Sequence, residues 1–208
     1  MKPWLLFGAG GTGVGAHLLT LALQAGRPVV ALVRNANAAE RLTALGARVV
    51  TGDACDNDAV IRACELAGKD ATVISTIGGS EDYLAHRTLI NAAERAGLSR
   101  MIMVTSLGCG DTWQYQSERA RVAFGDAVRE KTLAEAWLQT SQLDYAIVRP
   151  GGLLNGEASG RAQCFQHQEV HGFVNRKDVA WVIARLDADA ALNNQVYSLV
   201  EPGLKPGG

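Results

Sequence analysis

Near-continuous runs of aliphatic residues alternate with longer amphipathic stretches along almost the whole chain. The apolar runs lack the polar–apolar alternation of strands that face water on one side, and they are typical of parallel strands covered on both faces. Repeated strand–helix alternation implies right-handed crossover connections. The predicted strands are residues 4–7, 29–33, 48–51, 71–76, 101–105, 145–148 and 196–200, and the predicted helices are residues 13–25, 37–45, 57–67, 82–96, 120–140 and 177–187.

Four of the predicted helices end at a glycine, the residue that most readily adopts the left-handed conformation common at helix C-termini. These glycines are Gly26, Gly46, Gly68 and Gly97. The predicted fold class is α/β, a doubly wound, mostly parallel Rossmann-type sheet with helices on both faces. No internal repeat or low-complexity linker divides the chain. We therefore expect a single domain over residues 1–208, with an irregular segment at about 151–175 that forms a wall of the substrate site.

Composition and charge narrow the classes of function. Of the 208 residues, 48% are hydrophobic and 20% are charged, and the formal net charge is −1, as in ordinary globular proteins. There is no broad basic field to attract nucleic acid, and no apolar run approaches the roughly 20 residues of a membrane span. The four cysteines and four histidines lack the spacing of metal ligands. We expect a cytoplasmic monomer or homodimer that acts on a small molecule and binds no metal, nucleic acid or membrane.

A glycine-rich turn follows the first predicted strand, and Gly8, Gly10 and Gly13 fit the pattern G-x-G-x-x-G. In that order, the glycines would allow a tight turn, a close approach of the backbone to a pyrophosphate, and close contact between helix and strand. The free N–H groups and the positive dipole end of the following helix favour phosphate. This position favours a dinucleotide site over a simple tight turn. The residues assigned to the site are Gly8, Gly10, Gly11, Thr12, Gly13 and Val14.

The end of the second predicted strand indicates which dinucleotide is bound. NAD-preferring proteins carry an acidic residue there, about 20 residues after the glycine turn. In this chain Arg34 stands 21 residues after Gly13, and Asn35 follows as a neutral donor. Because guanidinium geometry suits phosphate, Arg34 favours the 2′-phosphate of NADP(H), with NAD(H) as the second choice. The alternative is a solvated surface arginine.

Two further strand ends are predicted at the same edge of the sheet, where ligands of such folds bind. Asp53 and Ala54 follow the third predicted strand, where a carboxylate can accept a hydrogen bond from the adenine amino group. Thr76, Ile77 and Gly78 follow the fourth, where small residues let the cofactor pass along the backbone. Both segments are assigned to the cofactor site, with ordinary turn chemistry as the alternative.

Further motifs stand in the second half of the chain, at residues 104–106, 131–135, 143–151 and 176–180. Together with the glycine turn, Arg34 and Gly52-Asp53, they resemble the atypical short-chain dehydrogenase/reductase group. This group comprises the NmrA-like and NAD(P)H-binding proteins related to flavin and biliverdin reductases. The resemblance covers nearly the whole chain, and the motifs at 143–151 and 176–180 are specific in combination.

The resemblance implies roles for several residues. Ser106 matches the serine that hydrogen-bonds a substrate carbonyl. Lys131 matches the lysine of a Tyr-x-x-x-Lys pair, which holds the nicotinamide ribose. Pro150 and Gly151 match the turn that passes the nicotinamide.

The tyrosine of that pair is missing, because Ala127 stands four residues before Lys131. In reductases of this superfamily the tyrosine protonates the developing alkoxide, so ordinary ketone reduction and sugar epimerisation are both disfavoured. Tyr115, four residues before Arg119, imitates the pair in spacing and is retained as a catalytic candidate. The favoured interpretation of Trp113 and Tyr115 is a substrate lid or packing.

The favoured function is NADPH-dependent reduction of a small conjugated acceptor, such as a quinone or a flavin. Hydride arriving at a delocalised acceptor can be followed by protonation from water, so the tyrosine is dispensable. The protein would orient the nicotinamide and exclude water. The alternative is a regulatory or scaffold protein that senses NADP(H) without turnover. A sugar-nucleotide epimerase or dehydratase is a weaker third possibility.

Overall fold

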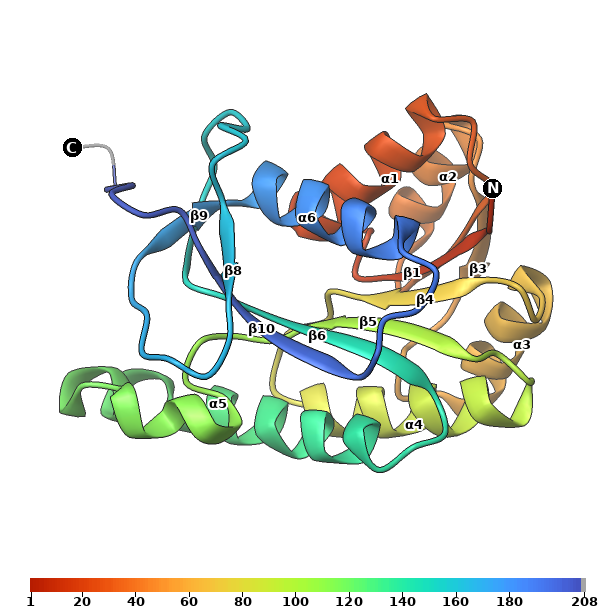
Figure 1. Ribbon diagram of the computed structural model, residues 1–208. Helices are drawn as coiled ribbons and strands as arrows, with labels where there is room; N and C mark the ends of the chain where they lie inside the picture. The colour runs from red at the N-terminus through yellow and green to blue at the C-terminus, as the bar shows by residue number, and fades with distance from the viewer. Residues whose placement is uncertain (207–208) are drawn as a thin grey trace.

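The strands and helices follow one another as the apolar runs and amphipathic stretches predict. The structure, a computed structural model, describes residues 1–206 (Figure 1). The helices are α1 (Val14–Gln24), α2 (Ala36–Ala44), α3 (Asn57–Ala67), α4 (Asp82–Arg95), α5 (Glu118–Gln139) and α6 (Arg176–Ala188), with a 3₁₀ helix, η1 (Gly110–Tyr115). The strands are β1 (Trp4–Phe7), β2 (Val29–Val33), β3 (Arg48–Thr51), β4 (Thr72–Ser75), β5 (Arg100–Val104), β6 (Asp144–Pro150), β7 (Gly152–Leu154), β8 (Gln163–Phe165), β9 (Phe173–Asn175) and β10 (Gln195–Val200).

Within residues 1–206, the main sheet has eight strands in the order β3-β2-β1-β4-β5-β6-β10-β8. Neighbouring strands from β3 to β10 pair in parallel, and β8 pairs with β10 in the antiparallel direction. The strand order reverses between β1 and β4, because the chain runs outward from β1 to β3 and then returns to β4 on the other side. The doubly wound α/β fold class is thereby confirmed.

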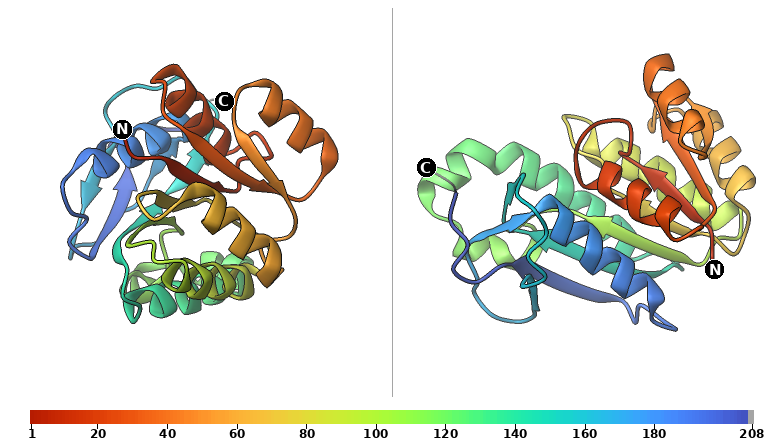
Figure 2. Two further views of the ribbon diagram at one scale, coloured as in Figure 1. Left: turned by 90° about the vertical axis from the view of Figure 1, so that its right-hand side faces the viewer. Right: turned by 90° about the horizontal axis from the view of Figure 1, so that it is seen from above.

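Two apolar cores lie on opposite faces of the sheet, and β1 contributes to both. Trp4 and Leu6 belong to the core under α1, α2 and α6, whereas Leu5 and Phe7 belong to the core under α3, α4 and α5. All four side chains are buried. This two-sided burial explains why the strands read as continuous apolar runs. Figure 2, in its view from above, shows α1 and α6 side by side, and they are in contact.

The glycines expected at helix ends adopt positive φ angles. The φ angles are 67° at Gly26, 102° at Gly46, 83° at Gly68 and 76° at Gly97. In residues 1–206, no helix combines the length and the apolar character needed to cross a membrane.

The segment at 151–175 is more regular than expected. It contains β7 and β9, which pair in parallel as a separate two-stranded sheet, and β8, which extends the edge of the main sheet. These strands have only three residues each, which is too short for an apolar period to stand out in the sequence. The prediction of an irregular segment was wrong for these nine positions.

Candidate functional site

A cavity of about 510 Å³ opens where the strand order reverses, at the carboxyl ends of β1, β2, β3 and β4. Open α/β sheets bind their ligands at this kind of position. The cavity contains ten of the residues assigned to the cofactor from sequence: Gly8, Gly10, Gly11, Arg34, Asn35, Asp53, Ala54, Thr76, Ile77 and Gly78. It is also lined by Phe7 and Gly79, which adjoin the assigned segments, and by residues that sequence reasoning missed: Leu32, Val33, Ala38, Cys55, Ser80, Glu81, Asp82 and Ala85.

The glycine turn combines positions where a side chain is impossible with positions that face open space. Gly8 has a φ of 91°, and a methyl group on it would lie 2.8 Å from the carbonyl oxygen of Thr76. A methyl group on Gly15 would lie 2.5 Å from the carbonyl oxygen of Gly8. By contrast, a methyl group on Gly11 or Gly13 would meet no atom within 4 Å. The turn is therefore a cradle of backbone that leaves room for a phosphate-bearing ligand.

The close helix–strand contact expected at Gly13 is instead made by Gly15. Gly13 is the N-cap residue of α1, with φ −80° and ψ −163°, and it offers no side-chain cap to the helix. The first N–H groups of a helix lack partners within the helix, and a Cβ on Gly13 would meet open space, so the residues present fit a pyrophosphate. The expectation for Gly13 was wrong because the motif spacing does not reveal which glycine the first helical turn presses against β1.

Two arginines lie near the glycine turn and the end of β2. Arg34 is exposed and lines the cavity at the end of β2. Arg41, on α2, donates from Nη2 to the carbonyl oxygen of Gly10 at 2.7 Å, which brings a second guanidinium to the glycine turn. Asn35 is the N-cap of α2, and its side-chain oxygen accepts from the N–H of Ala38 at 2.8 Å, which orients the side chain.

The loop after β3 is stabilised by a hydrogen bond to the side chain of Asp53. Asp53 accepts from the N–H of Cys55 through Oδ1 at 2.8 Å and lines the cavity with Ala54. Burial, with the neighbouring Asp53, raises the pKa of the Cys55 thiol to about 11. At neutral pH this thiol is protonated, so thiolate chemistry is not available beside the cavity.

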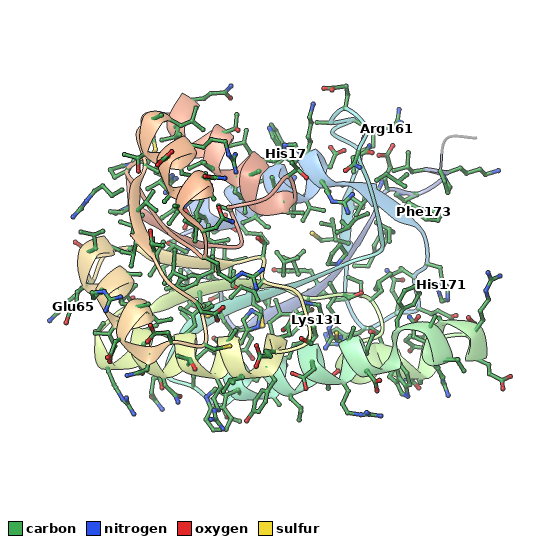
Figure 3. All side chains as sticks on the ribbon, turned by 180° about the vertical axis from the view of Figure 1, so that it is seen from behind. His17, Glu65, Lys131, Arg161, His171 and Phe173 are labelled. Atoms are coloured by element: carbon green, nitrogen blue, oxygen red, sulfur yellow. The ribbon has the colours of Figure 1, made fainter. Side chains whose placement is uncertain are left out.

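Lys131 projects from α5 toward the loop after β4, and Figure 3 shows it labelled between α5 and the sheet. Its ammonium donates to the carbonyl oxygen of Ile77 at 3.1 Å and to Oδ2 of Asp82 at 2.5 Å. Ile77 and Asp82 both line the cavity, so Lys131 stands directly behind its wall. One turn earlier, Ala127 is exposed and brings no proton donor. Lys131 is therefore present without the expected tyrosine, and its positive charge is balanced by the carboxylate of Asp82.

Ser106 and Pro150 lie next to each other at the ends of β5 and β6. The hydroxyl of Ser106 donates to the carbonyl oxygen of Leu107 at 3.1 Å, and the N–H of Leu107 donates to the carbonyl oxygen of Pro150 at 2.9 Å. Eight of the site residues expected from sequence do not line the 510 Å³ cavity. They are Thr12, Gly13, Val14, Ser106, Tyr115, Lys131, Pro150 and Gly151. The structure thus brings the cofactor candidates of β1 to β4 together and places Ser106 and Pro150 at the neighbouring strand ends.

Gly151 is required for packing. A side chain on it would collide with the carbonyl oxygen of Gly172, and its Cβ would lie 2.9 Å from a methyl group of Val200. Tyr115 ends η1 and is partly buried, and within residues 1–206 its hydroxyl forms no hydrogen bond. The geometry does not pair Tyr115 with Lys131.

Buried polar side chains hold the loops around the site. Arg149 pairs with Glu135 and also with Asp111, which fixes η1 against β6 and α5. Burial would lower the pKa of Arg149, but these two carboxylates outweigh burial and raise it. Asp178, on α6, accepts from the N–H groups of Ser159 and Gly160, which fastens the loop after β7. In residues 1–206, no group of three or more His, Cys, Asp and Glu side chains is arranged to hold a metal ion.

Residues 8–189 match a family model described as NAD(P)H-binding. The solved structure of ChuY, an anaerobillin reductase from Escherichia coli O157:H7, is 66% identical and superposes with a TM-score of 0.98, covering 99% of this chain and 100% of that one. An uncharacterized sugar epimerase, YhfK of Bacillus subtilis, is 32% identical over 97% of this chain and 94% of its own length. An NAD(P)H azoreductase of Xenophilus azovorans is 27% identical over 93% of this chain and 63% of its own length.

Proposed function

The chain belongs to the NAD(P)H-binding family of atypical short-chain dehydrogenases/reductases, and we propose that it is an NADPH-dependent reductase of a conjugated acceptor of the bilin type. The observation that carries the proposal is the site behind the cavity: Ala127 in place of the tyrosine, and Lys131 paired with Asp82. The similarity to ChuY, named as an anaerobillin reductase, supports the acceptor class.

The preference for NADPH rests on charge at the β2 side of the cavity. The adenine ribose of a dinucleotide lies near the end of the second strand in folds of this kind. Arg34 is exposed there, Arg41 reaches the neighbouring glycine turn, and no acidic side chain occupies the position of Arg34. Two guanidinium groups favour a phosphate dianion over a bare ribose hydroxyl.

The chemistry of the acceptor follows from what the site lacks. Reduction of an isolated ketone leaves a localised alkoxide that needs a positioned acid, and Ala127 supplies none. Lys131 cannot lend a free positive charge, because Asp82 neutralises it. A bilin is an open-chain conjugated tetrapyrrole, so charge that develops on it spreads over many atoms, and water can supply the proton. When bound, NADPH supplies the hydride, and the protein contributes position and exclusion of water.

Ala127 and the pairing of Lys131 with Asp82 also favour a second candidate, a protein that senses NADP(H) without turnover. The absence of a positioned acid is what a non-catalytic relative would share. A sugar epimerase, the description of YhfK, receives less support because epimerisation in this superfamily also uses the tyrosine.

Purified protein should be titrated with NADPH and NADH, and then mixed with anaerobillin, FMN and menadione while nicotinamide absorbance is followed. The proposal predicts tighter binding of NADPH and its oxidation by anaerobillin in preference to FMN or menadione. Saturable NADPH binding without oxidation by any acceptor would instead support the sensor. If only FMN or menadione oxidised NADPH, the protein would be a reductase, but the assignment of a bilin as its acceptor would be wrong.

A further inference from the structure

A line of polar side chains runs from the sheet core to Lys131. It consists of Ser75 on β4, His86 and Asp82 on α4, and Lys131 on α5. Ser75 and His86 are 0% exposed and Asp82 is 1% exposed, so each must satisfy its polar atoms within the protein. Burying polar side chains costs free energy, so their presence beside a cavity suggests a functional role.

The hydrogen bonds along this line run in one direction. Nδ1 of His86 lies 2.9 Å from both the carbonyl oxygen and Oδ1 of Asp82, which are both acceptors, so Nδ1 carries the proton. Nε2 of His86 then accepts from the hydroxyl of Ser75 at 2.8 Å. The hydroxyl oxygen of Ser75 lies 3.4 Å from the N–H of Ile77, which leaves its own proton for His86. The single proton on Nδ1 faces two acceptors, and its hydrogen bond goes to the carbonyl oxygen of Asp82.

The two oxygens of Asp82 face different side chains, and within residues 1–206 Oδ1 accepts no hydrogen bond. His86 approaches Oδ1, and the ammonium of Lys131 lies 2.5 Å from Oδ2. Burial would raise the pKa of Asp82, but the hydrogen bonds and charges of His86 and Lys131 outweigh burial, and its pKa is lowered. The carboxylate is therefore ionised at neutral pH and pulls the ammonium toward α4.

The position of Lys131 is thereby determined by α4 rather than by its own helix. An ammonium has three N–H groups, and those of Lys131 reach Asp82 and the carbonyl oxygen of Ile77, which leaves one for a ligand. A free lysine side chain loses rotamer entropy when it binds a ligand, whereas a lysine held in this way has already lost it.

We propose that Asp82 is the positioning residue of the cofactor site, which fixes the ammonium of Lys131 at the cavity wall, with His86 and Ser75 fixing Asp82 in turn. The proposal deepens the NADPH-binding part of the proposed function and does not depend on the identity of the acceptor. It assigns a role in dinucleotide binding to α4, a helix whose sequence contains none of the motifs recognised above.

The test is a double-mutant cycle on NADPH affinity in the purified full-length protein. Asp82→Asn should weaken NADPH binding about tenfold, the loss of one well-placed hydrogen bond. Lys131→Met should weaken it by a similar factor. In the Lys131→Met background, Asp82→Asn should cause no further loss, because Asp82 acts through Lys131.

Glu130→Gln is the matched control. Glu130 neighbours Lys131 on α5 and accepts from the N–H of Tyr83 on α4, so its replacement perturbs the same helix contact without touching the line. It should leave NADPH affinity unchanged. A loss from Asp82→Asn that persists undiminished in the Lys131→Met background would overturn the proposal and make Asp82 a structural residue only.

A second variant guards against poor folding of Asp82→Asn. His86→Gln keeps a donor beside Asp82 but cannot also reach Ser75, and it should weaken NADPH binding severalfold, again only when Lys131 is present. If His86→Gln bound NADPH as tightly as the unmodified protein, His86 would not be needed to fix Asp82. Because the readout is binding, failure of every acceptor would overturn the proposed reductase while leaving this test intact.

Discussion

Arg149 donates from Nε and Nη2 to the two carboxylate oxygens of Glu135, at 3.0 and 2.7 Å, where both side chains are almost completely buried. Glu135 also accepts from the hydroxyl of Thr105 at 2.6 Å, and Arg149 also pairs with Asp111. The Arg-Pro-Gly motif that carries much of the family resemblance thus begins with a structural residue. Its arginine ties β6 to α5 and to η1.

Replacing Glu135 by Gln should lower the free energy of unfolding by about 3 kcal/mol, because removing one partner of a buried pair leaves a poorly compensated charge. Urea unfolding followed by circular dichroism measures this. Arg129→Ala is the control, since Arg129 and Asp126 form an exposed pair that should contribute almost nothing. Equal effects of the two substitutions would refute the structural role of Glu135.

Two glycines of the turn should respond in opposite ways to alanine. Gly15→Ala places a methyl group 2.5 Å from the carbonyl oxygen of Gly8, so the thermal unfolding temperature without cofactor should fall. Gly13→Ala meets open space at an ordinary φ, so that temperature should hardly change. NADPH affinity of Gly13→Ala should nevertheless fall at least tenfold, because the methyl group occupies the place of the pyrophosphate. Unchanged NADPH affinity in Gly13→Ala would show that the dinucleotide does not lie there.

The two arginines beside the glycine turn should discriminate between the cofactors. Arg34→Gln should weaken NADPH binding roughly 10- to 100-fold, the range of a charge-assisted hydrogen bond, with little effect on NADH. Arg41→Gln should show the same preference with a smaller loss, since Arg41 is already bonded to Gly10. Fluorescence titration with both dinucleotides measures this. Arg48, at the amino end of β3, is a control whose replacement by Gln should change neither affinity. Equal losses for NADPH and NADH would defeat the assignment of NADPH.

Asp82 should make the fold sensitive to acid. Its pKa is lower in the folded protein than its ordinary value, so the ionised carboxylate stabilises the fold at every pH above the unfolded pKa of about 3.9. This stabilisation is lost as the pH falls through the lower, folded pKa. The gap in stability between the unmodified protein and Asp82→Asn should therefore be largest near pH 7 and shrink below about pH 4. Urea unfolding across this range measures the gap, and a constant gap would mean that ionisation of Asp82 does not support the fold.

Local pattern was sufficient for the seven parallel strands of the main sheet. The run Trp4–Phe7 is apolar at every position because both faces of β1 are covered, and Gly8 follows it because the turn needs a positive φ. These constraints act within a few residues, so they are visible along the chain. For the same reason Arg34 could be placed at the end of β2, one residue beyond the last apolar position.

Contacts between segments far apart in the chain were beyond sequence reasoning. Lys131 and Asp82 are 49 positions apart, and Arg41 meets Gly10 across 31 positions. Neither pair has a spacing that a helix or strand repeats, and each depends on how helices dock on the sheet. The close helix–strand contact is made by Gly15 and not by Gly13, and the sequence could not show this because it depends on the angle at which α1 leaves β1.

The sequence by itself determined the fold class, the position of the glycine-rich turn and the absence of the tyrosine at position 127, because each depends on residue type or on short-range periodicity. Only the tertiary structure decided that Lys131 pairs with Asp82, that Arg41 reaches the carbonyl oxygen of Gly10 and that residues 151–175 contain three strands. Those outcomes depend on distances between segments far apart in the chain, which packing of the two cores sets and local pattern does not record.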